Sequence, residues 1–174
     1  MVPNKIHIIG SVGSGKTTLA KKISNQYNIP FFELDNVVWE RHASGDIRRS
    51  EVARKEYLST ITQTKKWIIE GVHNEEWVTN SFREADIIIF LDPKYSVRTR
   101  RIIKRFFKQK LGFEESNYKP TFKIFFKMFK WNRYFEEIGK PNFFSKYEVY
   151  RGKIIIVRHK GEIENYLDER ETDF

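Results

Sequence analysis

A glycine-rich stretch near the N-terminus has the residue types and the spacing of a phosphate-binding loop. Gly10, Gly15, Lys16 and Thr17 match the pattern G-x-x-x-x-G-K-[ST]. In this pattern the glycines let backbone N–H groups converge on phosphate oxygens. The lysine reaches the β- and γ-phosphates, and the hydroxyl binds their magnesium ion. The residues that we predict to bind the nucleotide here are Gly10, Ser11, Val12, Gly13, Ser14, Gly15, Lys16, Thr17 and Thr18.

A strand and a helix are expected on either side of this loop. Ile6, Ile8 and Ile9 form a short apolar run rich in β-branched residues, which ends where the glycines begin. Between residues 19 and 23 the apolar side chains recur at helical spacing. The helix would point its partially positive N-terminus at the phosphates. An ordinary glycine-rich turn is the alternative, and both flanking elements argue against it.

Four further apolar runs are separated by stretches long enough for helices. The runs are IPFFELD, KWIIEG, DIIIFLD and KIIIVRH. Such alternation is typical of a parallel sheet with helices on both faces, so we predict a three-layer α/β/α fold with five parallel strands. The length suits a single domain, 1–174. Ligands of such sheets bind at the carboxyl ends of the strands, just after each run.

Two acidic residues stand at such strand ends. Asp35 ends FFELD, and Glu70 ends WIIE. An acid beside a phosphate-binding loop commonly holds the magnesium shell, so we predict that Thr17 and Glu70 bind the metal. Asp35 is predicted to position or deprotonate an acceptor hydroxyl. For each acid, capping a helix or facing water is the alternative, and the sequence leaves open which of the two stands on the metal side.

Composition and length narrow the classes of protein. The absence of cysteine excludes disulfides and thiol catalysis. No stretch is apolar enough to span a bilayer, and MVPNK leads into the first strand without a signal-type region, so we expect a cytoplasmic protein. The motifs D-x-x-G and N-K-x-D are absent, which argues against a Ras-type GTPase. We also expect the chain to be too short for a typical AAA or ABC module.

Four segments together resemble the adenylate-kinase-like P-loop kinases. They are GSVGSGKTT, FFELDNVVW, WIIEG and READIIIFLD, the last followed by RTRRIIKR. Within these kinases the chain is most similar to a bacterial group labelled DNA topology modulation proteins. The resemblance implies the nucleoside-monophosphate-kinase fold with strand order 2-3-1-4-5, and ATP and Mg²⁺ as ligands. It also implies a mobile lid, here 106–140, and two catalytic arginines, Arg101 and Arg105, which share one helix face.

The acceptor side of the site departs from that resemblance. His73 and Asn74 stand where these kinases usually carry a phosphate-binding arginine, which puts a nucleoside monophosphate acceptor in question and keeps small-molecule hydroxyls open. For Arg83 a surface ion pair is the alternative role, and for Trp39 it is core packing. Arg158, just after the last apolar run, is predicted to bind the nucleotide. The residues predicted to bind the acceptor are Asp35, Trp39, Gly71 and Arg83.

The segment 94–160 carries most of the positive charge. It has 19 Lys and Arg against 5 Glu, a net charge of +14, in a chain whose total is +9. Within it, TFKIFFKMFKWNRYFEE interleaves aromatic and basic residues. Such a surface can stack bases, and a basic amphipathic helix can lie on a membrane or bind in the groove of a partner. It can also pack its aromatics inward while the lysines stay in water, which is the interpretation that we favour.

These observations predict an ATP-binding kinase whose acceptor is an unidentified small molecule, nucleoside or nucleotide. The alternative is a nucleotide-binding regulatory protein that binds nucleic acid through the basic segment 94–160. The kinase is favoured because Lys16, Thr17 and Glu70, together with the two arginines, would supply the charge clamp that phosphoryl transfer requires.

Overall fold

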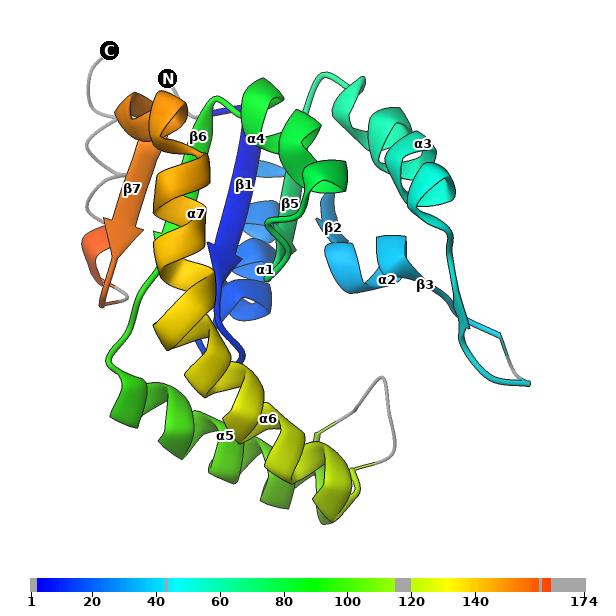
Figure 1. Ribbon diagram of the computed structural model, residues 1–174, viewed down its shortest axis with the longest axis vertical. Helices are drawn as coiled ribbons and strands as arrows, with labels where there is room; N and C mark the ends of the chain where they lie inside the picture. Colours follow the sequence, from blue (N-terminus) through cyan, green and yellow to red (C-terminus); the bar gives the residue numbers. More distant parts are fainter. Residues whose placement is uncertain (1–2, 43, 115–119, 160, 164–174) are drawn as a thin grey trace.

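Five parallel strands form the central sheet of the computed structural model, which describes residues 3–42, 44–114, 120–159 and 161–163 (Figure 1). The strands lie in the order β2-β5-β1-β6-β7, which is 2-3-1-4-5 when they are numbered along the chain. The predicted three-layer fold is therefore confirmed. The strands are β1 (Lys5–Gly10), β2 (Phe31–Glu33), β5 (Trp67–Gly71), β6 (Ile87–Leu91) and β7 (Ile154–Val157).

Helices cover both faces of this sheet (Figure 1). On one face, α1 (Lys16–Tyr27) buries Ala20 and Ile23 in a cluster with Ile6 and Ile8 of β1. The helices that pack on the other face are α2 (Leu34–Val38), α3 (Glu51–Thr62), η1 (Glu76–Val78), α4 (Thr79–Glu84) and α7 (Lys140–Lys146). In the described part of the chain, no helix is both long enough and apolar enough to cross a membrane.

A short antiparallel ribbon, which was not predicted from the sequence, follows α2. Its strands are β3 (Trp39–Glu40) and β4 (Ile47–Arg48). All four residues are exposed, and the guanidinium of Arg48 lies 5.9 Å from the centre of the Trp39 ring. Core packing, the alternative role for Trp39, is therefore wrong. Strands this short carry no apolar alternation that a sequence pattern could reveal.

Two long helices form a hairpin beyond the carboxyl edge of the sheet (Figure 1). They are α5 (Tyr95–Lys110) and α6 (Phe122–Tyr134), and the rings of Phe106 and Phe125 between them lie 4.4 Å apart. The chain then runs through a π-helical turn, η2 (Phe135–Gly139), into α7, where Phe143 is fully buried in the core. The predicted lid 106–140 therefore begins within α5 and ends where α7 starts; its movement stays a prediction.

The aromatic side chains of α6 divide between the interior of the hairpin and its surface. Phe125 and Phe129 are partly buried. Phe122, Phe126 and Trp131 are 50 to 62% exposed. The expectation that this segment packs its aromatics inward is therefore wrong for these three residues. A helix turns only one stripe of side chains toward its neighbour, and in α6 that stripe includes Met128 and Asn132.

Candidate functional site

The loop between β1 and α1 has a tight curl that depends on its glycines. Gly13 and Gly15 have φ angles of 73° and 103°, in the left-handed region that other residues rarely adopt. Gly10 is required for a different reason, since a Cβ there would lie 2.7 Å from the backbone oxygen of Leu91. The glycines therefore let the loop curl against β6, with the backbone conformation that a phosphate-binding loop needs.

Lys16 begins α1 at the end of this loop. Its ammonium group donates a hydrogen bond of 2.9 Å to the backbone oxygen of Ser11, so the side chain reaches back across the loop. Burial lowers the pKa of Lys16, and the carboxylates of Glu70 and Asp35 oppose that change. The N-cap residue is Gly15, which has no side chain to cap the first N–H groups of the helix. A phosphate bound here would meet these N–H groups and the lysine.

Thr17 and Glu70 lie together beside the loop. The Thr17 hydroxyl donates a hydrogen bond of 2.6 Å to Oε1 of Glu70. Burial raises the pKa of Glu70, although the ammonium of Lys16 and the Thr17 hydroxyl counteract this. Hydroxyl and carboxylate oxygens are ligands that Mg²⁺ accepts, usually with several water or phosphate oxygens in addition. Among the described residues, no group of three or more His, Cys, Asp or Glu could hold a metal ion.

The two predicted arginines of α5 occupy different places. Nη1 of Arg101 donates hydrogen bonds to the backbone oxygens of Ser14, at 2.7 Å, and of Gly13, at 3.3 Å. Arg105 forms an ion pair with Glu114 at 3.6 Å and is largely exposed, yet its charge contributes to lowering the pKa of Lys16. Arg101 therefore contacts the loop directly, whereas Arg105 pairs with Glu114 and acts on the loop through its charge. Contact of either with a transferring phosphate stays a prediction.

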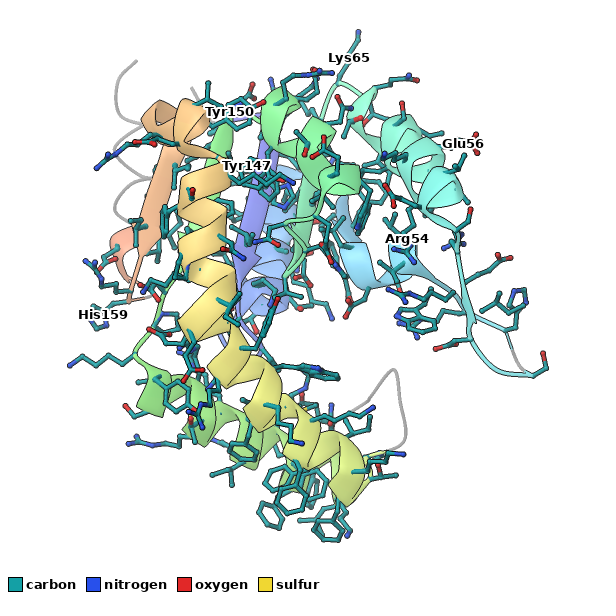
Figure 2. All side chains as sticks on the ribbon, viewed as in Figure 1. Arg54, Glu56, Lys65, Tyr147, Tyr150 and His159 are labelled. Atoms are coloured by element: carbon teal, nitrogen blue, oxygen red, sulfur yellow. The ribbon has the colours of Figure 1, made fainter. Side chains whose placement is uncertain are left out.

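A small cavity of about 100 Å³ lies between the loop and the ends of β6 and β7. Its walls include Thr18, Arg101 and Arg158, all three of them predicted site residues. The backbone N–H of Arg158 donates to Oε2 of Glu162 at 2.8 Å, which anchors the segment after β7. His159 also lines the cavity, and Figure 2 shows it at the lower end of β7. The cavity thus adjoins the loop on the side where β6 and β7 end.

A second group of charged side chains lies at the ends of β2 and β5. Nε2 of His73 is 3.8 Å from Oδ1 of Asp35, and its Nδ1 is 3.1 Å from Oε2 of Glu75. Burial tends to lower the pKa of His73, but the two carboxylates outweigh it and raise the pKa to about 9. The interaction with His73 in turn lowers the pKa of Asp35. At neutral pH the group is an imidazolium between two carboxylates.

The match to a known protein family covers most of this arrangement. The sequence model described as "ATPase family associated with various cellular activities (AAA)" matches residues 6–133, which include the loop, Asp35, Glu70 and both arginines of α5. The chain belongs to this family. The expectation that the chain is too short for an AAA module is therefore wrong, since the match needs only the part that carries the loop and the sheet around it.

One curated relative of this AAA-family chain is a kinase. An adenylate kinase from Wigglesworthia glossinidia brevipalpis is 30% identical over 109 residues, with 52% of each chain covered. The chain thus spans about half the length of the curated relative that it matches.

Solved structures with the same fold include two shikimate kinases. That of Aquifex aeolicus is 19% identical, with 97% of this chain and 99% of that chain covered and a TM-score of 0.51. That of Acinetobacter baumannii, in complex with shikimate, is 15% identical, with 92% and 84% covered and a TM-score of 0.55. An uncharacterised protein from Eubacterium ventriosum is 20% identical, with 94% and 97% covered and a TM-score of 0.52. These likenesses show the fold, and none of them supports the nucleic-acid alternative.

Three predicted acceptor residues of the AAA-family chain lie outside the charged group around Asp35. Arg83 precedes β6 and therefore lies at the amino edge of the sheet, opposite the loop, where it contacts Asn80 and Glu84. The prediction that Arg83 binds the acceptor does not agree with this position, because only the carboxyl ends of parallel strands meet at the loop. Trp39 lies in the exposed ribbon, and a Cβ at Gly71 would come within 2.8 Å of Leu34, which gives that glycine a packing role.

Four residues at the site were not predicted from the sequence: His73, Glu75, Glu33 and Asn132. His73 was noted only as a departure, although its place two residues after β5 follows the strand-end rule. Glu33 is the register partner of Glu70, so it adds a carboxylate to that edge. Asn132 accepts a hydrogen bond of 3.1 Å from the Ser11 hydroxyl and is fully buried. No local pattern marks Asn132, because 121 residues separate it from Ser11.

Proposed function

We propose that the chain is a phosphotransferase that moves the γ-phosphoryl group of Mg-ATP to a hydroxyl group of a small molecule. The observation that carries the proposal is the placement of two charged groups at one edge of the sheet. The nucleotide half consists of residues 10–18, Glu70 and Arg101. The acceptor half consists of Asp35, His73 and Glu75. The charge of Asp35 acts on the pKa of Lys16, so the two halves lie within electrostatic range.

The nucleotide half has the parts that hold a triphosphate. Lys16 and the uncapped N-terminus of α1 would bind the phosphate oxygens, and Thr17 with Glu70 would hold magnesium, which neutralises negative charge on the phosphates. Arg101 already contacts the loop oxygens from α5, so its guanidinium has only a short way to move to reach a phosphate. The nucleoside would lie on the side of the loop where Thr18 and Arg158 line a small cavity.

The acceptor half has the parts that orient a hydroxyl. Because His73 lowers its pKa, Asp35 is ionised at neutral pH and is a good hydrogen-bond acceptor for a hydroxyl but a weak base. This suits phosphoryl transfer, in which positioning and electrostatic stabilisation contribute more than early proton removal. His73 would hold the carboxylate in one orientation while its other nitrogen is held by Glu75.

The chemistry of the acceptor is inferred from a cation linked to the acceptor half through Trp77, whose ring lies 5.2 Å from that of His73. Arg54 of α3 lies on the side of that helix that faces α2 in Figure 2, 5.9 Å from the centre of the Trp77 ring. This cation favours an acceptor that carries a carboxylate as well as a hydroxyl, and one protein of the same fold is a kinase in complex with such a compound, shikimate. The resemblance to the bacterial topology modulation group stays a prediction and names no acceptor.

A transfer screen tests the proposal. The chain is incubated with γ-labelled Mg-ATP and panels of hydroxy acids, polyols, nucleosides and nucleotides, and labelled products are separated from inorganic phosphate. We expect labelled product from a hydroxyl compound with wild-type chain and with Lys21→Ala, and none with Lys16→Ala. Lys21 is the matched control because it lies exposed on the same helix. Equal transfer by the two lysine variants, or labelled product only from nucleoside monophosphates, would overturn the proposal.

A further inference from the structure

The outer side of the α5–α6 hairpin carries a group of exposed apolar side chains that the phosphotransfer site does not use. Their exposed fractions run from 39 to 80%. We call the group the hairpin patch, and it consists of Ile103, Phe107, Leu111, Phe113, Phe122 and Phe126. Most exposed apolar residues occur singly on a protein surface, whereas a contiguous patch usually marks an interaction site.

The patch borders the side chains that hold the hairpin together, because Phe107 and Phe122 both have ring contacts with the buried Phe106. In α5, Ile102 and Phe106 face inward and are buried. Ile103, Phe107 and Leu111 follow one another at four-residue spacing, which places them on one stripe of α5 turned away from that inner side. The ring of Phe106 lies 5.3 Å from that of Phe122, so the inner cluster connects α5 to the α6 part of the patch.

Positive charge surrounds the patch. The helices α5 and α6 together contain eleven Lys and Arg residues and no Asp or Glu. Four exposed lysines stand next to patch residues in the sequence of the two helices: Lys104, Lys108, Lys123 and Lys127. The ammonium group of Lys110 lies 3.9 Å from the centre of the Phe122 ring, so charge and apolar surface are in direct contact.

We propose that the hairpin patch docks the chain on the surface of an anionic lipid bilayer. Helices that lie in the bilayer interface combine protruding Phe and Leu side chains with flanking Lys and Arg, which matches both features of this surface. The hairpin also stands out beyond the edge of the sheet in Figure 1, so a flat surface can reach it. Since no described helix could span a membrane, the contact is with the surface alone.

The structure favours a bilayer over the two other occupants of such a patch. Binding of single-stranded nucleic acid relies on aromatic rings in a groove, whereas Ile103 and Leu111 have no ring and the patch lies on a projecting hairpin. A second copy of the chain would bring the same positive helices face to face, with repulsion between them. Acidic headgroups at the rim and acyl chains at the centre complement both parts of the patch.

Vesicle sedimentation of the full chain tests this proposal. We expect it to bind phosphatidylcholine vesicles that contain about 30% phosphatidylserine, and pure phosphatidylcholine vesicles much more weakly. Raising the salt from about 0.1 M to about 0.5 M should weaken the binding. The triple variant with Phe107→Ser, Phe113→Ser and Phe126→Ser should bind the anionic vesicles at least roughly tenfold more weakly than the wild type. Its control is Ile47→Ser, Val52→Ser, Val149→Ser, which removes three similarly exposed apolar residues elsewhere and should bind like the wild type.

A charge variant separates the contribution of the lysines. Replacing Lys104, Lys108, Lys123 and Lys127 by Gln should weaken vesicle binding by about fivefold for each lysine at low salt. The control replaces Lys21, Lys55, Lys65 and Lys66, which are exposed outside the hairpin. Thermal unfolding checks that each variant is folded.

Several results would overturn the proposal. They are the absence of binding to anionic vesicles, vesicle binding that the serine variant leaves unchanged, and binding that falls equally in patch and control variants. An oligonucleotide that competes for the same lysines while vesicles do not bind would assign the patch to nucleic acid. A wild-type dimer that the serine variant converts to monomer in analytical ultracentrifugation, without vesicle binding, would assign it to a second copy.

Discussion

The nucleotide half and the acceptor half of the site lie at the same edge of the sheet but are built in different ways. Nine consecutive residues, 10–18, supply most of the nucleotide half, and their backbone is fixed by glycines and by the start of α1. The acceptor half joins Asp35 to His73, 38 positions further along the chain, through side chains alone. A phosphate needs many N–H donors in one place, which a single loop can supply. An acceptor needs a few side chains in a particular orientation, and those come from several elements.

The largest effect is expected from the nucleotide half. Lys16→Ala should lower phosphotransfer by on the order of a thousandfold, because it removes a preorganised charge that has no substitute in the loop. Transfer is measured with γ-labelled ATP, and ATP affinity by calorimetry. The far-ultraviolet circular dichroism should stay unchanged, since the ammonium group makes one hydrogen bond, to Ser11. A folded variant with normal ATP binding and transfer would contradict the assignment of the loop to the nucleotide.

Asp35→Asn should lower phosphotransfer by on the order of a hundredfold. The amide keeps the shape of the side chain but loses the negative charge that pairs with His73 and that, in the proposed role, would orient the hydroxyl. The rate is measured at saturating Mg-ATP with the acceptor that the screen identifies. Asp46→Asn is the matched control, because Asp46 is an acid of the same type that pairs with Arg41 in the exposed ribbon segment. Equal rates in the two variants would show that Asp35 is structural.

Glu70→Gln should raise the concentration of Mg²⁺ needed for half-maximal transfer by roughly tenfold. The amide can still accept the hydrogen bond from Thr17, but it no longer offers a charged oxygen to the ion. Magnesium titration in the presence of fixed ATP measures the change. Glu33→Gln, in the register position beside it, distinguishes the two carboxylates. If only the Glu33 variant alters the titration, the metal side of the site belongs to Glu33.

His73→Gln should have a smaller effect, roughly fivefold on transfer near neutral pH, but a clear effect on the pH profile. The pKa of His73 is raised to about 9, so its stabilising interactions are present below its ordinary value of 6.5 and are lost as the pH rises through 9. Wild-type transfer should therefore fall near pH 9, and the variant should lack that limb. Because His73 lowers the pKa of Asp35, the acid limb of the variant should move to higher pH.

The control for this profile is His42→Gln, since His42 also pairs with a carboxylate, that of Glu40, at 3.2 Å in the ribbon. Its pH profile should match that of the wild type. An unchanged alkaline limb in His73→Gln would mean that His73 does not act on the acceptor half.

The difference between the halves also explains how much the sequence predicted. The loop, the strand before it and the helix after it were predicted because each has a local pattern, and the same is true of the five parallel strands. Their order was implied by the resemblance to the adenylate-kinase-like P-loop kinases, and the sheet has that order. Asp35 and Glu70 were found because they end apolar runs. Arg83 was misplaced because it precedes a strand, and a position before a strand lies at the opposite edge of the sheet. Asn132, the partner of Ser11, and His73, the partner of Asp35, come from distant segments of the chain. Contacts between distant segments leave no periodic signal in the sequence.

If two separate halves act in one transfer reaction, calorimetric titration of Mg-ATP into the double variant Asp35→Asn, His73→Gln should distinguish binding from transfer. We expect the dissociation constant for Mg-ATP to stay within about twofold of the wild-type value while phosphotransfer is lost, because both substitutions lie on the acceptor side. A dissociation constant that rises together with the loss of transfer would instead assign Asp35 and His73 to the nucleotide half.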